Sequence, residues 1–271
     1  MINSLNKNYL KLVFSTMLFI SLSVVYAQTE DDFRFTENAT GDGIIITEYI
    51  GKRTKGTQVR IPATIQGKPV KEIGDNAFKN PILFGLDDDI TSIIIPQGVT
   101  VIGNHAFYLC GDLQTITIPE GVTDIGYWAF DGCKKLSSIT LPKSLTSMGD
   151  SVFSGCSSLK TVTFNTTNLT IIPIAAFSGC ISLTRVVIPE GVVTIDENAF
   201  SYCLNITTVV LPATIKEIAH CAFAVCSALT TITIPDSVTS IQFDDVVFLA
   251  CTKLNGPSRD ALKKRGYQGR F

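Results

Sequence analysis

The sequence is poor in charged residues and in histidine, and it has no concentrated basic segment. Asp, Glu, Lys and Arg together make up 17% of the 271 residues, with a formal net charge of −2. Polyanion binding requires Lys and Arg gathered on one face, but the one dense basic run is Lys263-Lys264-Arg265 near the end of the chain. This distribution argues against nucleic acid as a partner.

The residues that carry catalysis or bind metal ions are also sparse. The two histidines, His105 and His220, lie far apart, and Cys221 beside His220 does not by itself create a nucleophile–base pair. The sequence has no C-x-x-C pair, and the acidic cluster at residues 87–89 lacks the spacing of a calcium loop. We therefore predict no enzyme activity, no metal site and no cofactor.

Long apolar runs are absent after residue 27. The N-terminal stretch has Lys7 and Lys11 before the apolar run LVFSTMLFISLSVVYA, which ends in a small residue at Ala27. These features predict a signal peptide at residues 1–27, cleaved before Gln28, and an uncleaved membrane anchor is the alternative. We expect no membrane insertion after cleavage and a secreted or cell-surface location, with the periplasm as a further location.

What the sequence does contain is a phrase repeated about every 23 residues, as in LQTITIPEGVTDIGYWAFDGC. The phenylalanines of the copies are Phe78, Phe107, Phe130, Phe153, Phe177, Phe200, Phe223 and Phe248. A cysteine follows three residues after all but the first, at Cys110, Cys133, Cys156, Cys180, Cys203, Cys226 and Cys251. A fixed period of this length indicates a solenoid, in which each unit buries its apolar face against its neighbours.

Each unit contains one alternating apolar segment that predicts a short strand. In the clearest copy, Ile116 and Ile118 flank Thr117, and this period of two indicates a strand with one face buried. Pro119 then ends the strand, because proline cannot donate a ladder hydrogen bond. The apolar residues should therefore form columns through the core, with the phenylalanine rings stacked along it.

The remainder of the unit should lead back to the next strand. Val122 and Ile125 indicate a turn and a short second strand, Gly126 a corner, and Ala129-Phe130 an inward-facing helical turn. We predict a repeat solenoid with one short parallel strand in each unit of about 23 residues, capped at both ends.

The less regular segments predict the boundaries of this solenoid. After the signal peptide, we expect a linker at 28–43, an N-terminal cap with the first repeat at 44–89, repeats at 90–254 and a C-terminal cap at 255–271. In the last segment, Ser258 to Arg265 should form a short helix with Ser258 as N-cap and Gly266 as C-cap. Such a helix would cover the open end of the core.

Two units inside the repeat region depart from the common pattern. Around Asn165 the strand proline is missing, and Pro173 replaces the corner glycine in the same unit. The last unit contains two additional residues, which we place between Ile241 and Phe248. The solenoid should therefore be irregular at both positions.

Three interpretations of the cysteine column are open: buried thiols, disulfide pairs and a metal site. Consecutive cysteines should lie about 4.7–4.9 Å apart, which is within disulfide range, and export permits oxidation. However, parallel Cβ vectors suit the disulfide dihedral poorly, and a line of thiols is not a tetrahedral cage. We therefore favour small buried thiols, with Cys221 outside the column.

The outward side of the predicted strands is the best candidate for a binding surface. Threonine suits exposed strand positions in any protein, but a regular, nearly uncharged sheet can also dock an extended partner. Two columns of residues form this surface: Thr115, Ser138, Thr161, Arg185, Thr208 and Thr231, and beside them Thr117, Thr140, Thr163, Val187, Val210 and Thr233.

The phrases ITIPEGVTDIGYWAFDGC, VVIPEGVVTIDENAFSYC and ITIPDSVTSI closely resemble the BspA-like leucine-rich repeat, a class of bacterial surface antigens. The resemblance covers roughly Ile44 to Phe271. It implies a leucine-rich-repeat solenoid, a right-handed superhelix, in a secreted or cell-surface bacterial protein. It further implies adhesion to extracellular-matrix proteins, host cells or other bacteria. The alternative is a structural role, in which the repeat self-associates or packs with envelope components.

Overall fold

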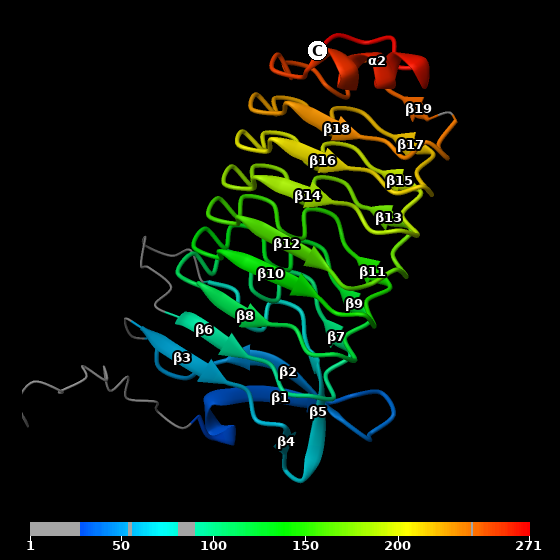
Figure 1. The fold of residues 1–271 in the computed structure, drawn as a ribbon. Coiled ribbons are helices and arrows are strands. Elements are labelled where there is room, and N and C mark those ends of the chain that lie inside the picture. The colour runs from blue at the N-terminus through cyan, green and yellow to red at the C-terminus, as the bar shows by residue number, and fades with distance from the viewer. Residues whose placement is uncertain (1–27, 54–55, 81–89, 240) are drawn as a thin grey trace, which may run out of the picture.

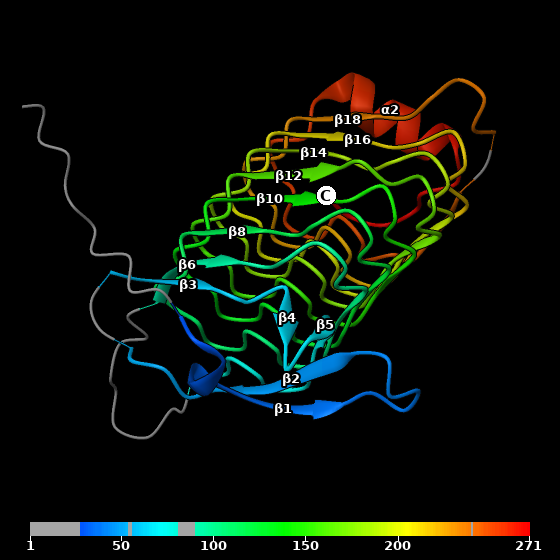
Figure 2. The same cartoon turned by 90° about the horizontal axis from the view of Figure 1, so that it is seen from below.

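The computed structural model describes residues 28–53, 56–80, 90–239 and 241–271. Within these residues, the chain forms about eight turns stacked along one axis, with parallel strands about 23 residues apart (Figure 1). Seen along the stack, each turn contributes a first strand, a second strand and a return leg of turns (Figure 2). The predicted repeat solenoid is confirmed.

The first strand of each turn belongs to a parallel sheet whose residues alternate between buried and outward-facing. In β8, Ile116 is buried, whereas Thr115 and Thr117 are exposed. Hydrogen bonds join the strands in three groups, which are β3-β6-β8, β10-β12 and β14-β16-β18. The strands are β3 (Thr57–Arg60), β6 (Ile90–Ile94), β8 (Thr115–Thr117), β10 (Ser138–Leu141), β12 (Thr161–Phe164), β14 (Arg185–Val187), β16 (Thr208–Val210) and β18 (Thr231–Thr233).

The predicted second strands are also present, and they form two separate sheets. The N-terminal sheet contains β2 (Ile44–Tyr49), β5 (Lys68–Ile73), β7 (Val101–Ile102), β9 (Asp124–Ile125) and β11 (Ser147–Met148). The C-terminal sheet contains β13 (Ile171–Ile172), β15 (Thr194–Ile195), β17 (Glu217–Ile218) and β19 (Gln242–Phe243). Among the described strands, no ladder joins β11 to β13.

The irregular unit around Asn165 lies at this interruption. Its first strand β12 pairs with β10 of the preceding unit, whereas its second strand β13 pairs with β15 of the following unit. Thr166 holds the altered backbone between them: its buried hydroxyl donates to the carbonyl oxygen of Leu145 at 2.6 Å and accepts from the amide of Asn168 at 3.0 Å. The unit is therefore divided between the two halves of the solenoid.

At Gly126, the corner after the second strand has no space for a side chain. A Cβ atom on Gly126 would lie 2.6 Å from the amide nitrogen of Asn104 in the preceding unit. The residue with a left-handed, positive φ lies two positions after the corner. In successive units it is Asn76, His105, Trp128, Ser151, Ala175, Asn198 and Cys221. Because a left-handed residue interrupts a right-handed helix, the return leg forms successive turns rather than the predicted helical turn.

The eight phenylalanines form the predicted column of stacked rings. Neighbouring ring centroids lie 5.0–5.6 Å apart, and every ring is fully buried. Tyr49 extends the stack at one end, with its ring 5.3 Å from that of Phe78. Tyr267 ends it at the other, where its ring stands at 87° to that of Phe248. The core is thus one continuous aromatic column closed by a tyrosine at each end.

Residues 28–43 form part of a structured cap, where the sequence led us to expect a linker. After the 3-10 turn η1 (Glu30–Asp32), β1 (Phe33–Glu37) pairs antiparallel with β2. Phe33 is buried, and its ring lies 5.4 Å from that of Tyr49. The strand forms here because it covers the open end of the ring stack. A short strand β4 (Thr64–Ile65) pairs antiparallel with β5.

Two sequence-based predictions fall outside the described residues: the signal peptide at residues 1–27 and the acidic cluster at residues 87–89. Within the part of the chain that the structure describes, no helix has the length and apolar character needed to cross a membrane.

A helix closes the C-terminal end of the core, starting two residues before the predicted position. Helix α2 spans Gly256–Lys264, and its N-cap is Asn255, whose side chain accepts a hydrogen bond from the amide of Ser258 at 2.9 Å. Ser258 itself is buried, and its hydroxyl accepts from the amide of Ile232 in β18 at 3.1 Å. The predicted N-cap is therefore wrong, because Ser258 bonds to the sheet edge. Gly266 follows the helix with a left-handed φ of +111°.

Candidate binding surface

The outward side of the first sheet, which we call the strand face, carries all of the residues predicted to bind a partner. The parallel ladders align them in two columns: Thr140 lies opposite Thr163, and Arg185 lies opposite Thr208. Most of these side chains are exposed, namely Thr115, Thr117, Ser138, Thr140, Thr161, Thr163, Arg185, Val187 and Thr233, while Thr208, Val210 and Thr231 are half-buried. The structure thus brings the predicted residues together on one surface.

The chemistry of the strand face is that of hydroxyls with few charges. Thr115 donates to the hydroxyl of Ser92 across the ladder at 3.2 Å, and Arg185 is the one charged residue in the two columns. Val187 adds an apolar site, with 46% of its side chain exposed. Short β-branched side chains on a ladder keep the surface even, so it can accept an extended partner without a deep pocket.

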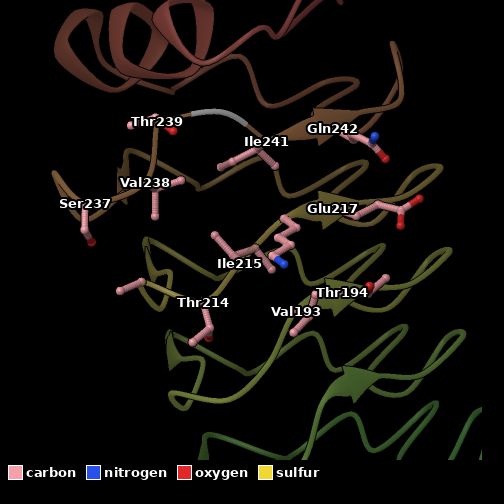
Figure 3. A pocket seen from close by; sticks show the side chains of 12 residues that line it. Val193, Thr194, Thr214, Ile215, Glu217, Ser237, Val238, Thr239, Ile241 and Gln242 are labelled. Atoms are coloured by element: carbon pink, nitrogen blue, oxygen red, sulfur yellow. The ribbon is translucent and has the colours of Figure 1, made fainter.

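A groove that the sequence did not predict lies near the C-terminal end. It has a volume of about 750 Å³ and is formed by the segments 193–194, 213–217, 237–239 and 241–242 (Figure 3). Ile215, Val238 and Ile241 are buried beneath it, and Lys216 and Glu217 are exposed at its edge. The groove combines an apolar floor with one charge of each sign.

The insertion in the last unit falls in the segment before β19 that borders this groove, and not where the sequence suggested. The ladder pairs Ile218 with Phe243, so the insertion precedes β19 instead of following Ile241. Phe243 takes the strand position because its ring packs 6.3 Å from that of Phe248. The amide of Ile241 then bonds to the carbonyl of Arg265 at 3.3 Å, outside the sheet. The spacing of 25 residues between Phe223 and Phe248 shows in the sequence that the last unit is longer. It does not show which residue of that unit pairs with Ile218 in the ladder.

The column cysteines are buried free thiols, with no disulfide among them. Each sulfur donates to the main-chain oxygen of the core phenylalanine one unit before, as in Cys133 to Phe107 at 3.3 Å and Cys156 to Phe130 at 3.2 Å. Burial raises the pKa of the Cys203 thiol to about 12, so the thiol stays protonated near neutral pH. These contacts give the column a structural role in joining successive units.

The two histidines do not share a site. The ring of His105 stacks on Trp128, whereas His220 lies 3.2 Å from a carboxylate oxygen of Asp244, several units away. Burial, and then the charges of Asp244 and Glu197, raise the pKa of the Cys221 thiol beside His220. A raised pKa disfavours the thiolate that a nucleophile requires. Within the described residues, no three His, Cys, Asp or Glu side chains could share a metal ion.

Two kinds of comparison place these features among known proteins. The family model described as the BspA type leucine rich repeat region matches in six copies, over residues 71–203 and 163–258. None of the curated proteins matches the chain.

Solved structures of bacterial leucine-rich repeat proteins share the fold. The leucine rich repeat protein of T. pallidum (TpLRR) is 31% identical, with a TM-score of 0.66, and the match covers 90% of this chain and 98% of that one. A leucine-rich repeat protein of Eubacterium ventriosum is 27% identical, with a TM-score of 0.56, over 82% of this chain and 51% of that one. A third, from Bacteroides ovatus, is 22% identical, with a TM-score of 0.51, over 85% of this chain and 70% of that one.

Proposed function

Because this chain belongs to the BspA type leucine rich repeat family, we propose that it is an exported bacterial protein that binds other proteins through its strand face. The family assignment supports protein interaction as the general role. The finer proposal is adhesion: the protein is secreted or held at the cell surface, where it binds extracellular-matrix proteins, host cells or other bacteria.

The observation that carries this proposal is the strand face, which extends over the first strands of successive units. Within each group of paired strands the outward residues are in register, and short hydroxyl and apolar side chains dominate them. A partner can lie along several units and make many small contacts there, which is how solenoid surfaces provide affinity. The nearly neutral surface favours contacts of shape and hydrogen bonding over electrostatic attraction.

A binding experiment with a strand-face variant tests the proposal. The variant replaces Thr140, Thr163 and Arg185 with alanine, which removes contact atoms from adjacent strands without touching a buried residue. The chain from Gln28 onward is applied to immobilised collagen, laminin and fibronectin and to intact host and bacterial cells. We expect the strand-face variant to lose at least tenfold in affinity for whichever target the unchanged chain binds.

A matched control distinguishes this surface from the rest of the molecule. Ser147, Thr170 and Lys143 are exposed and lie off the strand face, so replacing them with alanine should leave binding unchanged. Equal binding by the control and the strand-face variant would exclude the strand face as the site. Light scattering at several protein concentrations would show self-assembly, and growth into larger particles would favour the structural role instead.

A further inference from the structure

An exposed group of aromatic rings, the aromatic corner, lies on the return legs of two adjacent units. It consists of His105, Tyr108, Tyr127 and Trp128. The His105 ring stacks on Trp128 at 5.1 Å and meets Tyr108 edge-on at 5.3 Å, and the Tyr127 ring lies 6.0 Å from that of Trp128. The exposed fractions of Tyr127 and Trp128 are 48% and 40%. These rings belong to no core column, since the core ring of this unit is Phe130.

Trp128 occupies a position that the fold does not require to be aromatic. Its φ is +53°, and the equivalent left-handed position holds His in the preceding unit and Asn, Ser, Ala or Cys in the others. A bulky residue with positive φ is strained, and residues held in such conformations cluster at functional sites. With 40% of its surface exposed, the indole also gains less from burial than a core ring does. Trp128 therefore introduces backbone strain that its own burial offsets only in part.

Only one face of the Trp128 ring has a stacked ring among the described residues. His105 covers the face toward the preceding unit, with an angle of 17° between the two rings. On the other side, the next residue at the same repeat position is Ser151, which is too small to cover an indole. The following unit therefore has no ring at this repeat position to stack on the indole.

Two aspartates adjoin Trp128 through the main chain. The Trp128 amide bonds to the main-chain oxygen of Asp150 at 3.0 Å, and the Asp131 amide bonds to the oxygen of Trp128 at 3.2 Å. Burial raises the pKa of Asp131, whereas a hydrogen bond with Ser154 and the nearby His105 ring lower it, so the Asp131 carboxylate lies close to the corner. Both aspartate side chains are half-buried, and neither forms an ion pair with Lys or Arg among the described residues. The corner already accepts one cation elsewhere, because the Lys79 ammonium lies 5.5 Å from the centre of the Tyr108 ring.

From this arrangement we propose that the aromatic corner binds an arginine side chain on a basic segment of a partner protein. A guanidinium group stacks on an aromatic face and at the same time pairs with a carboxylate, and it is the side chain best suited to both contacts. The face of Trp128 that carries no stacked ring provides the stacking surface, and Asp131 and Asp150 provide the opposite charge. This site is separate from the strand face, so each can be tested without the other.

Trp128 also provides the measurement, because it is the only tryptophan in the chain. The chain from Gln28 onward is titrated with the peptide acetyl-Gly-Arg-Gly-Arg-Gly-amide while tryptophan emission is recorded. A second peptide carries citrulline in place of arginine, which keeps the shape and removes the charge. We expect a saturable emission change with the arginine peptide and none with the citrulline peptide.

Variants assign the binding to the corner. Asp131→Asn combined with Asp150→Asn should weaken binding about tenfold, since each removes one charged partner. Asp236→Asn, at an exposed position in a distant unit, changes the net charge without touching the corner and should leave affinity unchanged. Trp128→Asn should abolish binding measured by calorimetry while the melting temperature stays the same or rises, because asparagine tolerates the left-handed conformation.

Three results would overturn the inference. An equal emission change with the citrulline peptide would show that binding does not depend on the charge of the arginine side chain. Equal affinity of the double aspartate variant and the unchanged chain would show that the two carboxylates do not contribute to binding. A saturable response to an N-acetylglucosamine oligomer, with none to the arginine peptide, would make the corner a sugar-binding surface instead.

Discussion

At the scale of single residues, the phenylalanine column contributes most to stability. Each ring is fully buried between two others, so removing one leaves a cavity that the neighbouring units cannot close without moving. We predict that Phe130→Ala lowers the free energy of unfolding by about 3–5 kcal/mol in urea titration. Tyr202→Ala is the matched control, because this ring is 57% exposed, and it should cost less than about 0.5 kcal/mol. Similar losses in the two variants would contradict the stacked core.

The buried thiols predict a loss of stability in alkaline solution. Burial raises the pKa of Cys203 from 9.0 to about 12 and raises that of Cys180 well above 9.0. In the unfolded chain these thiols ionise near pH 9, whereas in the folded chain they stay protonated. The stability that they contribute is therefore complete below pH 9 and decreases as the pH rises from about 9 to about 12.

Urea midpoints measured at pH 8, 9, 10 and 11 test this dependence. We expect a steady decrease above pH 9 and a shallower one in Cys203→Ala, although Tyr267, whose pKa burial also raises to about 12, contributes in the same direction. Thiol titration should detect eight reactive cysteines in the denatured chain, the total in the sequence. A midpoint that does not change up to pH 11 would contradict the raised pKa values.

At the scale of elements, Ser258 attaches helix α2 to the edge of the first sheet. Its buried hydroxyl accepts from the amide of Ile232 at 3.1 Å and donates to the carbonyl of the same residue at 3.4 Å. We predict that Ser258→Ala lowers the free energy of unfolding by about 1–3 kcal/mol, because it leaves buried polar groups of β18 without a partner. Asn255→Ala removes the helix cap and an exposed hydrogen bond to the Thr231 hydroxyl, and it should cost about 1 kcal/mol. The order of the two losses in urea titration checks the assignment, and the reverse order would make Ser258 a simple capping residue.

What repeats along the chain could be predicted, because each unit places the same residue in the same surroundings. The Phe130 and Cys133 columns, the strand at Thr117 and the outward threonines all follow from the period. The contacts that do not repeat could not be predicted. Phe33 forms a strand because it covers the first ring of a stack, and Ser258 bonds to a strand that is distant in sequence.

The same limit applies to the surfaces. Alternation along each strand located the strand face, but the groove near Ile241 depends on which of several residues enters the ladder after an insertion. That choice is made by the packing of Phe243 against the C-terminal cap, with its ring 5.5 Å from that of Tyr267. A local pattern contains no information about such a contact between separate segments.

At the scale of the whole molecule, the solenoid consists of two blocks joined through one irregular unit. The core continues across the junction, since the Phe153 and Phe177 rings stack at 5.4 Å. The sheets do not continue: among the described strands, β11 has no ladder to β13, and β12 has none to β14. In a linear repeat protein, cooperativity depends on the interface between neighbouring units. The first sheet is also interrupted between β8 and β10, but there the second sheet continues through β7, β9 and β11. Among the described strands, both ladders are interrupted only at this junction, so we expect it to be the weakest interface inside the solenoid.

We predict that the two blocks open separately when the junction is weakened. Thr166→Ala removes the hydroxyl that bonds both Leu145 and Asn168, so it should cost about 1–3 kcal/mol and uncouple the blocks. Hydrogen exchange in increasing urea, measured by mass spectrometry, should then show peptides from β13 to β19 opening at a different concentration from those of β5 to β11. Thr123→Ala is the matched control, because its hydroxyl also bonds to a main-chain oxygen, that of Thr100 at 3.2 Å, within a continuous sheet. That variant should keep a single opening transition. If Thr166→Ala also exchanges as one unit, the stacked rings and the return-leg hydrogen bonds, such as that from the Phe153 amide to the Ala176 oxygen at 2.8 Å, are enough to couple the two blocks. The interruption of the sheets would then have no consequence for folding.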